Sequence, residues 1–245
     1  MNAVELEIAA NSLASALAAQ EGGADRIELC AALEVGGLTP SHATIALVRE
    51  RVKIPIYVLI RARAGDFVYD DAECETMQRD IEHCVAEGCD GVVLGALDAD
   101  GNVDLPRCRA LIGAAGKLGV TFHRAFDLTR DPRQALEDAI ALGCERVLTS
   151  GGQASALAGA ALIRDLVVQA AGRIAIMAGA GVDATNIAAL RTQTGAREFH
   201  ASAKRMRAAR AHHATAASPG MDAGELRSDV AEVRRLVTAL RDSAI

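Results

Sequence analysis

The chain has 245 residues, of which 51% are hydrophobic, and a formal net charge of −6. This charge gives no electrostatic footprint for a polyanion, and two Tyr, four Phe and no Trp leave few rings for stacking bases. We therefore expect no nucleic-acid partner. No basic region followed by an apolar run opens the chain, and glycine or charged residues interrupt every apolar run before it reaches membrane-spanning length. We expect a cytoplasmic protein without a membrane partner.

Short apolar runs alternate with helical patterns along the whole chain. The runs, predicted as strands, are 4–9, 26–30, 54–63, 91–97, 120–127, 146–151, 173–181 and 197–203. Apolar residues have helical spacing in 12–20, 41–51, 71–87, 105–118, 132–142, 158–171, 184–191 and 224–240. Such alternation requires a parallel sheet, and eight units without a long linker favour one (β/α)8 TIM barrel over residues 1–245.

The alternative is an open doubly wound sheet. No G-x-G-x-x-G follows the first predicted strand, where a dinucleotide-binding fold would place it, so the barrel is favoured. The only long connection without periodicity is 204–223, which follows the eighth strand. We expect this segment to be a loop on the functional face, before the last helix, either as a lid or as disordered chain.

Ionisable side chains are predicted to point into the barrel from several strands. A strand alternates its side chains between two faces, and barrel sites lie at the carboxyl ends of the strands. Glu5 and Glu198 lie early in their strands, and we expect them to form structural ion pairs. The candidate catalytic residues lie nearer the carboxyl ends or just beyond them: Glu7, Glu28, Arg61, His123, Asp127 and His200. Arg63 shares the parity of Arg61 and is a candidate anion ligand.

Two glycine-rich stretches follow the sixth and seventh predicted strands. Backbone N–H groups at such positions bind anions, and barrels often hold phosphate in their late loops. The candidate anion-binding residues of these stretches are Ser150, Gly151, Gly152, Gly179 and Gly181. The structural alternative is that these glycines only form tight turns. With the inward-facing residues they predict a pocket for a small anionic ligand.

Several stretches, spread through the chain to about residue 205, resemble the CutC family of copper homeostasis proteins. They are 24–30 (ADRIELC), 36–41 (GGLTPS), 60–67 (IRARAGDF), 121–127 (TFHRAFD), 146–152 (RVLTSGG) and 198–202 (EFHAS). The resemblance implies a (β/α)8 barrel, a cytoplasmic location, a homo-oligomer and a link to copper. Ala180 departs from the family pattern, which usually has glycine there, and this weakens the anion-loop interpretation.

Copper(I) prefers thiolate and thioether ligands. Of six cysteines, none in a C-x-x-C pair, only Cys30 is predicted at the mouth of the barrel, and it matches the cysteine of the family's Ile-Glu-Leu-Cys motif. Cys89 and Cys144 precede strands at the opposite end, and the remaining cysteines lie in predicted helices. Cys30 is thus the candidate copper ligand, although one thiol makes a poor copper site without a second ligand.

Three hypotheses follow. The first is a cytosolic copper-binding protein with Cys30 as a ligand. The second is an enzyme that acts on a small anionic or phosphorylated metabolite, with Arg61 and the glycine loops holding the anion and His123 and the glutamates exchanging protons. A divalent metal held by Glu28, His123 or His200 is a variant of the second. The third is a non-catalytic interaction scaffold.

Overall fold

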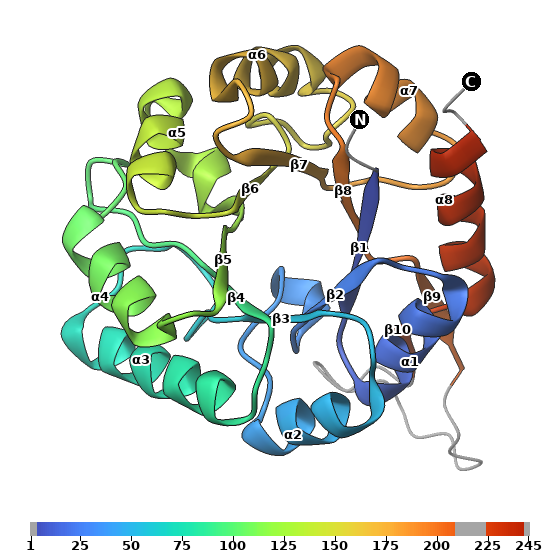
Figure 1. Ribbon diagram of the computed structural model, residues 1–245, viewed down its shortest axis with the longest axis horizontal. Helices are drawn as coiled ribbons and strands as arrows, with labels where there is room; N and C mark the ends of the chain where they lie inside the picture. Colours follow the sequence, from blue (N-terminus) through green and yellow to red (C-terminus); the bar gives the residue numbers. More distant parts are fainter. Residues whose placement is uncertain (1–3, 209–223, 243–245) are drawn as a thin grey trace, which may run out of the picture.

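The structure is a computed structural model, which describes residues 4–208 and 224–242. Eight parallel strands close into a barrel in chain order, and the helices surround it (Figure 1). The strands are β1 (Glu5–Ala10), β2 (Arg26–Leu29), β3 (Ile56–Leu59), β4 (Gly91–Leu94), β5 (Gly119–Phe122), β6 (Arg146–Thr149), β7 (Ala175–Gly179) and β8 (Glu198–Ala201). The predicted TIM barrel is confirmed.

The outer ring contains eight α-helices among the described residues. They are α1 (Leu13–Gly22), α2 (His42–Arg51), α3 (Asp71–Ala86), α4 (Leu105–Ala115), α5 (Pro132–Ala141), α6 (Ala160–Ala170), α7 (Ile187–Thr194) and α8 (Val230–Asp242). Side chains cap most of these helices. At α3, Asp70 accepts from the backbone N–H of Glu73, and Glu73 accepts from that of Asp70, which satisfies two N–H groups that the helix leaves unpaired.

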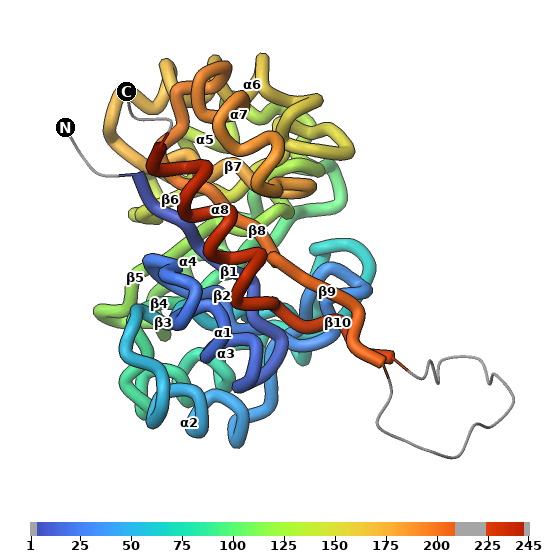
Figure 2. Tube along the Cα trace, turned by 90° about the vertical axis from the view of Figure 1, so that its right-hand side faces the viewer, coloured from blue at the N-terminus to red at the C-terminus, as the bar shows by residue number. Residues whose placement is uncertain are grey.

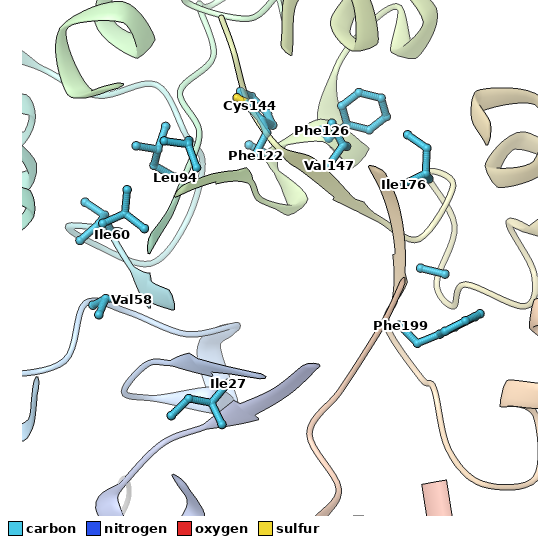
Figure 3. Close-up of a cluster of buried hydrophobic side chains, with 14 of the residues drawn as sticks. Ile27, Val58, Ile60, Leu94, Phe122, Phe126, Cys144, Val147, Ile176 and Phe199 are labelled. Atoms are coloured by element: carbon cyan, nitrogen blue, oxygen red, sulfur yellow. The ribbon is translucent and has the colours of Figure 1, made fainter. Parts of the chain in front are cut away.

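The main hydrophobic core lies between the strands and the helices. Figure 3 shows strand residues such as Ile27, Leu94 and Phe199 pointing away from the barrel centre toward this layer. The opposite faces of the strands fill the barrel interior, where Cys30, Tyr57, Leu59 and Val93 form a small apolar cluster. Ionisable side chains point into the same interior, which is the arrangement expected from the strand alternation.

The segment after β8 differs from the prediction. Residues Lys204–Arg207 form strand β9, which pairs antiparallel with β10 (Glu225–Ser228), and this ribbon projects from the barrel (Figure 2). The predicted last helix therefore begins at Val230 rather than at residue 224, because Ser228 is anchored to the backbone oxygen of Ala9 and Asp229 caps the helix. Residues 209–223 of the predicted loop lie outside the described residues.

Two short 3-10 helices also border the carboxyl ends of the strands: η1 (Leu33–Val35) after β2, and η2 (Arg124–Leu128) after β5. Strand β3 ends at Leu59, so Arg61 and Arg63, which were predicted within the strand, lie in the loop beyond it. No helix among the described residues has both the length and the hydropathy to cross a bilayer.

Candidate functional site

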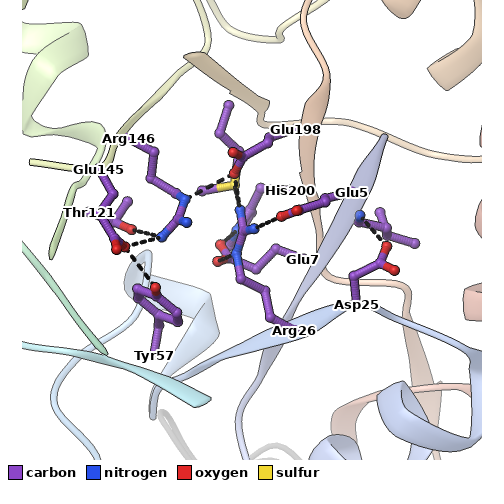
Figure 4. A network of polar contacts seen from close by, with 12 residues as sticks. Glu5, Glu7, Asp25, Arg26, Tyr57, Thr121, Glu145, Arg146, Glu198 and His200 are labelled. Atoms are coloured by element: carbon purple, nitrogen blue, oxygen red, sulfur yellow. Dashed lines mark hydrogen bonds and ion pairs between the residues drawn. The ribbon is translucent and has the colours of Figure 1, made fainter. Parts of the chain in front are cut away.

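A layer of ion pairs, drawn in Figure 4, fills the barrel interior near the amino ends of the strands. Arg26 is 3% exposed and forms ion pairs with Glu5, Glu7 and Glu198. Beside it, Nε of Arg146 lies 2.9 Å from Oε2 of Glu198. A buried cation with matched carboxylates is satisfied within the layer, so Glu5 and Glu198 occupy the ion-pair positions that the sequence suggested.

Sequence reasoning missed the two arginines of this layer. Arg26 lies two residues before Glu28 on β2, so both side chains point to the same face of the strand, into the barrel. The alternation of side chains along the strand therefore already indicated an inward arginine. The strand register then places Arg26 beside Glu7 on β1. Arg146 begins β6, and its guanidinium carbon lies 4.7 Å from the ring centre of Tyr57, a cation–π contact.

Glu7 connects this layer to the part of the interior that lies nearer the carboxyl ends of the strands. One of its oxygens lies 2.6 Å from Nε of Arg26, and the other lies 2.7 Å from Nδ1 of His200, its neighbour on β8. Burial raises the pKa of Glu7, but Arg26 and His200 outweigh this effect and lower it to about 2. Burial disfavours the charged form of His200, yet Glu28 and Glu7 raise its pKa above the ordinary value. Glu7 is therefore held as a carboxylate.

Glu28 is buried, and it forms no ion pair with any of the described residues. Burial, the largest effect, raises the pKa of Glu28 to about 7. Its Oε2 atom has no hydrogen-bond partner within residues 4–208 and 224–242. A carboxyl group that titrates near neutral pH and has a free oxygen suits proton transfer.

The ligand atoms of Glu7, Glu28 and His200 lie within 4.8 Å of one another. Carboxylate oxygens and an imidazole nitrogen suit borderline divalent metals rather than copper(I). However, the guanidinium of Arg26 lies directly against Glu7, and its charge opposes a second cation at this position. The residues present thus fit a metal poorly.

A pocket of about 280 Å³ opens above Glu28 at the carboxyl ends of the strands. Among the predicted catalytic residues, five line it: Glu28, Arg61, His123, Asp127 and His200. Glu7 lies behind His200. Apolar side chains, including Leu59, Phe67 and Leu148, form much of the remaining wall. The pocket combines an apolar lining with a few convergent polar groups, which is typical of small-molecule sites.

Arg61 reaches this pocket, and three backbone oxygens hold its guanidinium group. Its Nη1 donates to the carbonyls of Val35 and Gly37 at 2.9 and 3.0 Å, and its Nη2 donates to that of Gly65 at 2.9 Å. Its Nε has no partner, and it forms no ion pair with any described residue. The guanidinium carbon lies 4.9 Å from the ring centre of Phe67. A buried cation without a counter-ion favours an anionic ligand.

His123 faces the pocket from the end of β5, and is 4% exposed. Its Nδ1 accepts a hydrogen bond from the backbone N–H of Ala125 at 3.2 Å, while its Nε2 has no partner in the described chain. Burial, assisted by Arg61, lowers the pKa of His123 to about 3, so the ring is neutral. Gly95 makes room for it, because a Cβ there would lie 2.8 Å from Nδ1.

The carboxylate of Asp127 occupies the glycine-rich stretch that follows β6. Asp127 accepts from the backbone N–H groups of Ser150 and Gly152 and from the hydroxyl groups of Thr149 and Ser150. The N–H group of Gly151 donates instead to Oγ1 of Thr149. The predicted anion donors of this loop therefore already hold an anion, which is Asp127.

The other predicted anion ligands, Gly179, Gly181 and Arg63, do not line the pocket. At Gly179 a Cβ would lie 2.5 Å from Leu148 and 3.2 Å from Cβ of His200, so this glycine makes room for neighbours. The carbonyl of Gly181 accepts from the side chain of Asn186. Arg63 is bound by Glu73 and Asp66 and does not line the pocket.

Cys30 lies inside the barrel but not in the pocket lining. It is 1% exposed and packs with the apolar interior cluster defined above. Burial, with smaller contributions from Glu28 and Glu34, raises the pKa of its thiol. The thiol is therefore protonated and enclosed.

Comparisons with known proteins cover the whole barrel. The model of the CutC family matches residues 4–205. A protein named family protein CutC from Xanthomonas campestris pv. campestris (strain B100) is 62% identical over 236 residues, covering 96% of this chain and 98% of that protein. Its counterpart in Xylella fastidiosa (strain Temecula1 / ATCC 700964) is 59% identical over 239 residues, with coverages of 98% and 90%. A crystal structure of a Streptococcus agalactiae CutC, named for copper homeostasis, is similar with a TM-score of 0.78 at 32% identity, covering 81% of this chain and 98% of that chain.

Proposed function

The chain belongs to the CutC family, and we propose that the pocket at its barrel mouth binds a small organic anion and exchanges a proton with it. One observation carries this proposal. Three buried polar atoms that lack hydrogen-bond partners among the described residues, Oε2 of Glu28, Nε of Arg61 and Nε2 of His123, belong to residues that line one pocket. Leaving a buried polar group unpaired is costly, so the three atoms together favour a ligand that pairs with them.

Each residue has a role that its surroundings support. Arg61 supplies the positive charge for a carboxylate or phosphate group. Glu28 exchanges the proton, since its pKa of about 7 lets it gain or lose one near neutral pH. The imidazole of His200, held by Glu7, lies beside Glu28, and the two carboxyl groups raise its pKa. Asp127 positions the loops around the pocket through its contacts with Ser150 and Gly152.

Titration calorimetry with 2-phosphoglycolate tests the binding part of the proposal, using two arginines of one loop. We expect Arg61→Gln to weaken binding by about tenfold or more, because it removes a charge-assisted contact. Arg63→Gln is the matched control, since Arg63 lies outside the pocket, and it should bind like the parent. Failure of the parent to bind 2-phosphoglycolate or oxalate, or equal losses in both variants, would contradict the proposal.

Copper homeostasis, for which the Streptococcus agalactiae relative is named, is the second candidate, and it rests on family membership. The predicted ligand does not fit copper(I). Cys30 offers one protonated thiol among carbon atoms, and no second soft ligand is placed with it in the described chain. We therefore assign no copper-binding role to Cys30. Titration with copper(I) and a competing chelator separates the candidates, because Cys30→Ser weakens binding only if the thiol is a ligand. A cytoplasmic location and a homo-oligomeric state stay predictions.

A further inference from the structure

The hydrogen bonding of His123 indicates a second feature of the ligand, besides its negative charge. Because the N–H group of Ala125 donates to Nδ1, that nitrogen carries no proton. The proton of the neutral ring is therefore on Nε2. Nε2 belongs to a residue that lines the pocket and has no partner in the described chain. A protonated Nε2 donates a hydrogen bond, and it can neither accept a proton nor coordinate a metal.

We propose that the ligand has a carbonyl oxygen that accepts this hydrogen bond, and that Glu28 removes a proton from the carbon next to the carbonyl. This inference rests on the proposed function and names its substrate class: a small carboxylate or phosphate that also contains a carbonyl group. The pocket is built for three features of such a molecule. Among the described residues, Arg61 is a cation without a counter-ion, Nε2 of His123 is a neutral donor without an acceptor, and Oε2 of Glu28 is an acceptor without a donor.

The reaction balances without another reactant. The C–H bond breaks and its proton moves to Oε2 of Glu28. The bonding pair forms a C=C double bond, and the π pair of the carbonyl moves onto its oxygen, which the N–H group of His123 stabilises. Return of the proton from Glu28 to the same carbon restores the C–H bond and the carbonyl group, so the step is a reversible exchange of that proton with solvent through Glu28. A neutral imidazole is suited to this role, since its fixed N–H group stabilises the oxyanion as charge develops.

The positions of these residues in the pocket agree with the separate roles of Glu28, His123 and Arg61. Glu28 comes from β2 and His123 from the end of β5, so the acceptor and the donor reach the ligand from different strands. Phe67 contacts both His123, at 4.8 Å between ring centres, and Arg61, at 4.9 Å from the guanidinium carbon. The donor and the cation therefore both pack against one aromatic ring.

The test compares two ligands with one phosphate each. Phosphoglycolohydroxamate is planar and mimics an enediolate, whereas glycerol 3-phosphate has a saturated carbon chain. We expect the parent to bind the planar ligand roughly 100-fold more tightly, as expected for an analogue of a reaction intermediate. His123→Phe removes the donor and should abolish most of this preference without weakening glycerol 3-phosphate binding. His123→Gln keeps an N–H donor and should retain part of it. Oxalate and glycolate make the corresponding carboxylate pair.

A second measurement detects removal of the proton from the carbon next to the carbonyl. In D2O the parent should exchange deuterium into dihydroxyacetone phosphate or pyruvate, observed by proton NMR, and Glu28→Gln should not. Equal affinities within both ligand pairs, or no exchange in any probe that binds, would overturn this inference and leave anion binding intact. Binding of neither pair would instead overturn the proposed function on which it rests.

Discussion

The backbone nitrogen of Ser150 lies 3.0 and 3.1 Å from the two carboxylate oxygens of Asp127. Through this contact the 3-10 helix η2, which lies after β5, binds the loop that follows β6. An external anion at this loop would have to displace a carboxylate that is already in place. We therefore assign Asp127 a positioning role and Arg61 the role of attracting the ligand.

Asp127→Asn should destabilise the protein, because an amide replaces an anion that accepts hydrogen bonds from Ser150 and Gly152. We expect a loss of about 2–4 kcal/mol in the free energy of unfolding, measured by urea denaturation. Asp165→Asn is the control. Asp165 pairs with Arg133 at the surface, and its substitution should cost less than about 1 kcal/mol. Equal effects of the two substitutions would contradict this role for Asp127.

Glu28 and Glu7 should make stability depend on pH in opposite directions. The pKa of folded Glu28, about 7, lies above its unfolded value near 4.5, so its stabilising contribution is complete below about pH 4.5 and is lost as the pH rises to 7. The pKa of folded Glu7 is about 2, so its contribution is present above about pH 4.5 and is lost as the pH falls toward 2.

Urea denaturation of Glu28→Gln across this range checks the first of these effects. Glutamine cannot ionise, so we expect the variant to lose less stability than the parent between about pH 4.5 and 7, by roughly 3 kcal/mol at most. Glu7→Gln serves as the comparison, because it should be less stable than the parent at neutral pH. Parallel pH profiles for the parent and Glu28→Gln would show that Glu28 does not titrate in this range.

Arg26→Met should be among the most damaging single substitutions. It leaves the buried carboxylate of Glu7 and the half-buried carboxylate of Glu198 without their shared cation, and removing one partner of a buried ion pair typically costs about 3–5 kcal/mol. Arg79→Met removes an exposed arginine that pairs with Glu75 on the same helix, and it should leave stability nearly unchanged. Thermal unfolding of both variants checks this, and a mild effect at Arg26 would contradict a central role for the ion-pair layer.

Gly95→Ala should weaken ligand binding through His123. The added Cβ would lie 2.8 Å from Nδ1 and 2.9 Å from Cε1 of the imidazole, which is too close, so the ring must move. We expect a loss of roughly tenfold or more in affinity for the planar ligand, since displaced groups lose their alignment. Gly113→Ala in α4 is the matched control, because a Cβ there meets nothing within 4 Å. Calorimetry that shows equal affinities for both variants would contradict the prediction.

The sequence predicted the barrel well because strand alternation and helix caps are local signals. The same alternation placed Glu28 and His200 inside the barrel, and the carboxyl-end rule placed Arg61 and His123 at its mouth. Each of these predictions needed only the parity of a residue and its distance from the end of a strand.

The remaining features of the site depend on contacts between distant segments. The pairing of Asp127 with Ser150 requires the relative height of two loops, which no periodicity specifies. Leu226 of β10 pairs with Met206 of β9 across a long connection. The apolar spacing of residues 224–240 extends through β10, so it predicts a helix where these first residues form a strand. The tautomer of His123 depends on one backbone N–H group, at Ala125, whose direction is set by the 3-10 turn.

The ion pairs around Arg26 and Arg146, together with the side chain of Met177, close the barrel below the pocket. A (β/α)8 barrel is packed through its centre and has no axial channel. Any ligand of the proposed site would therefore enter and leave through the same opening. A ligand that dissociates slowly would then keep the next molecule out, so exchange at the site would be limited by dissociation through that opening.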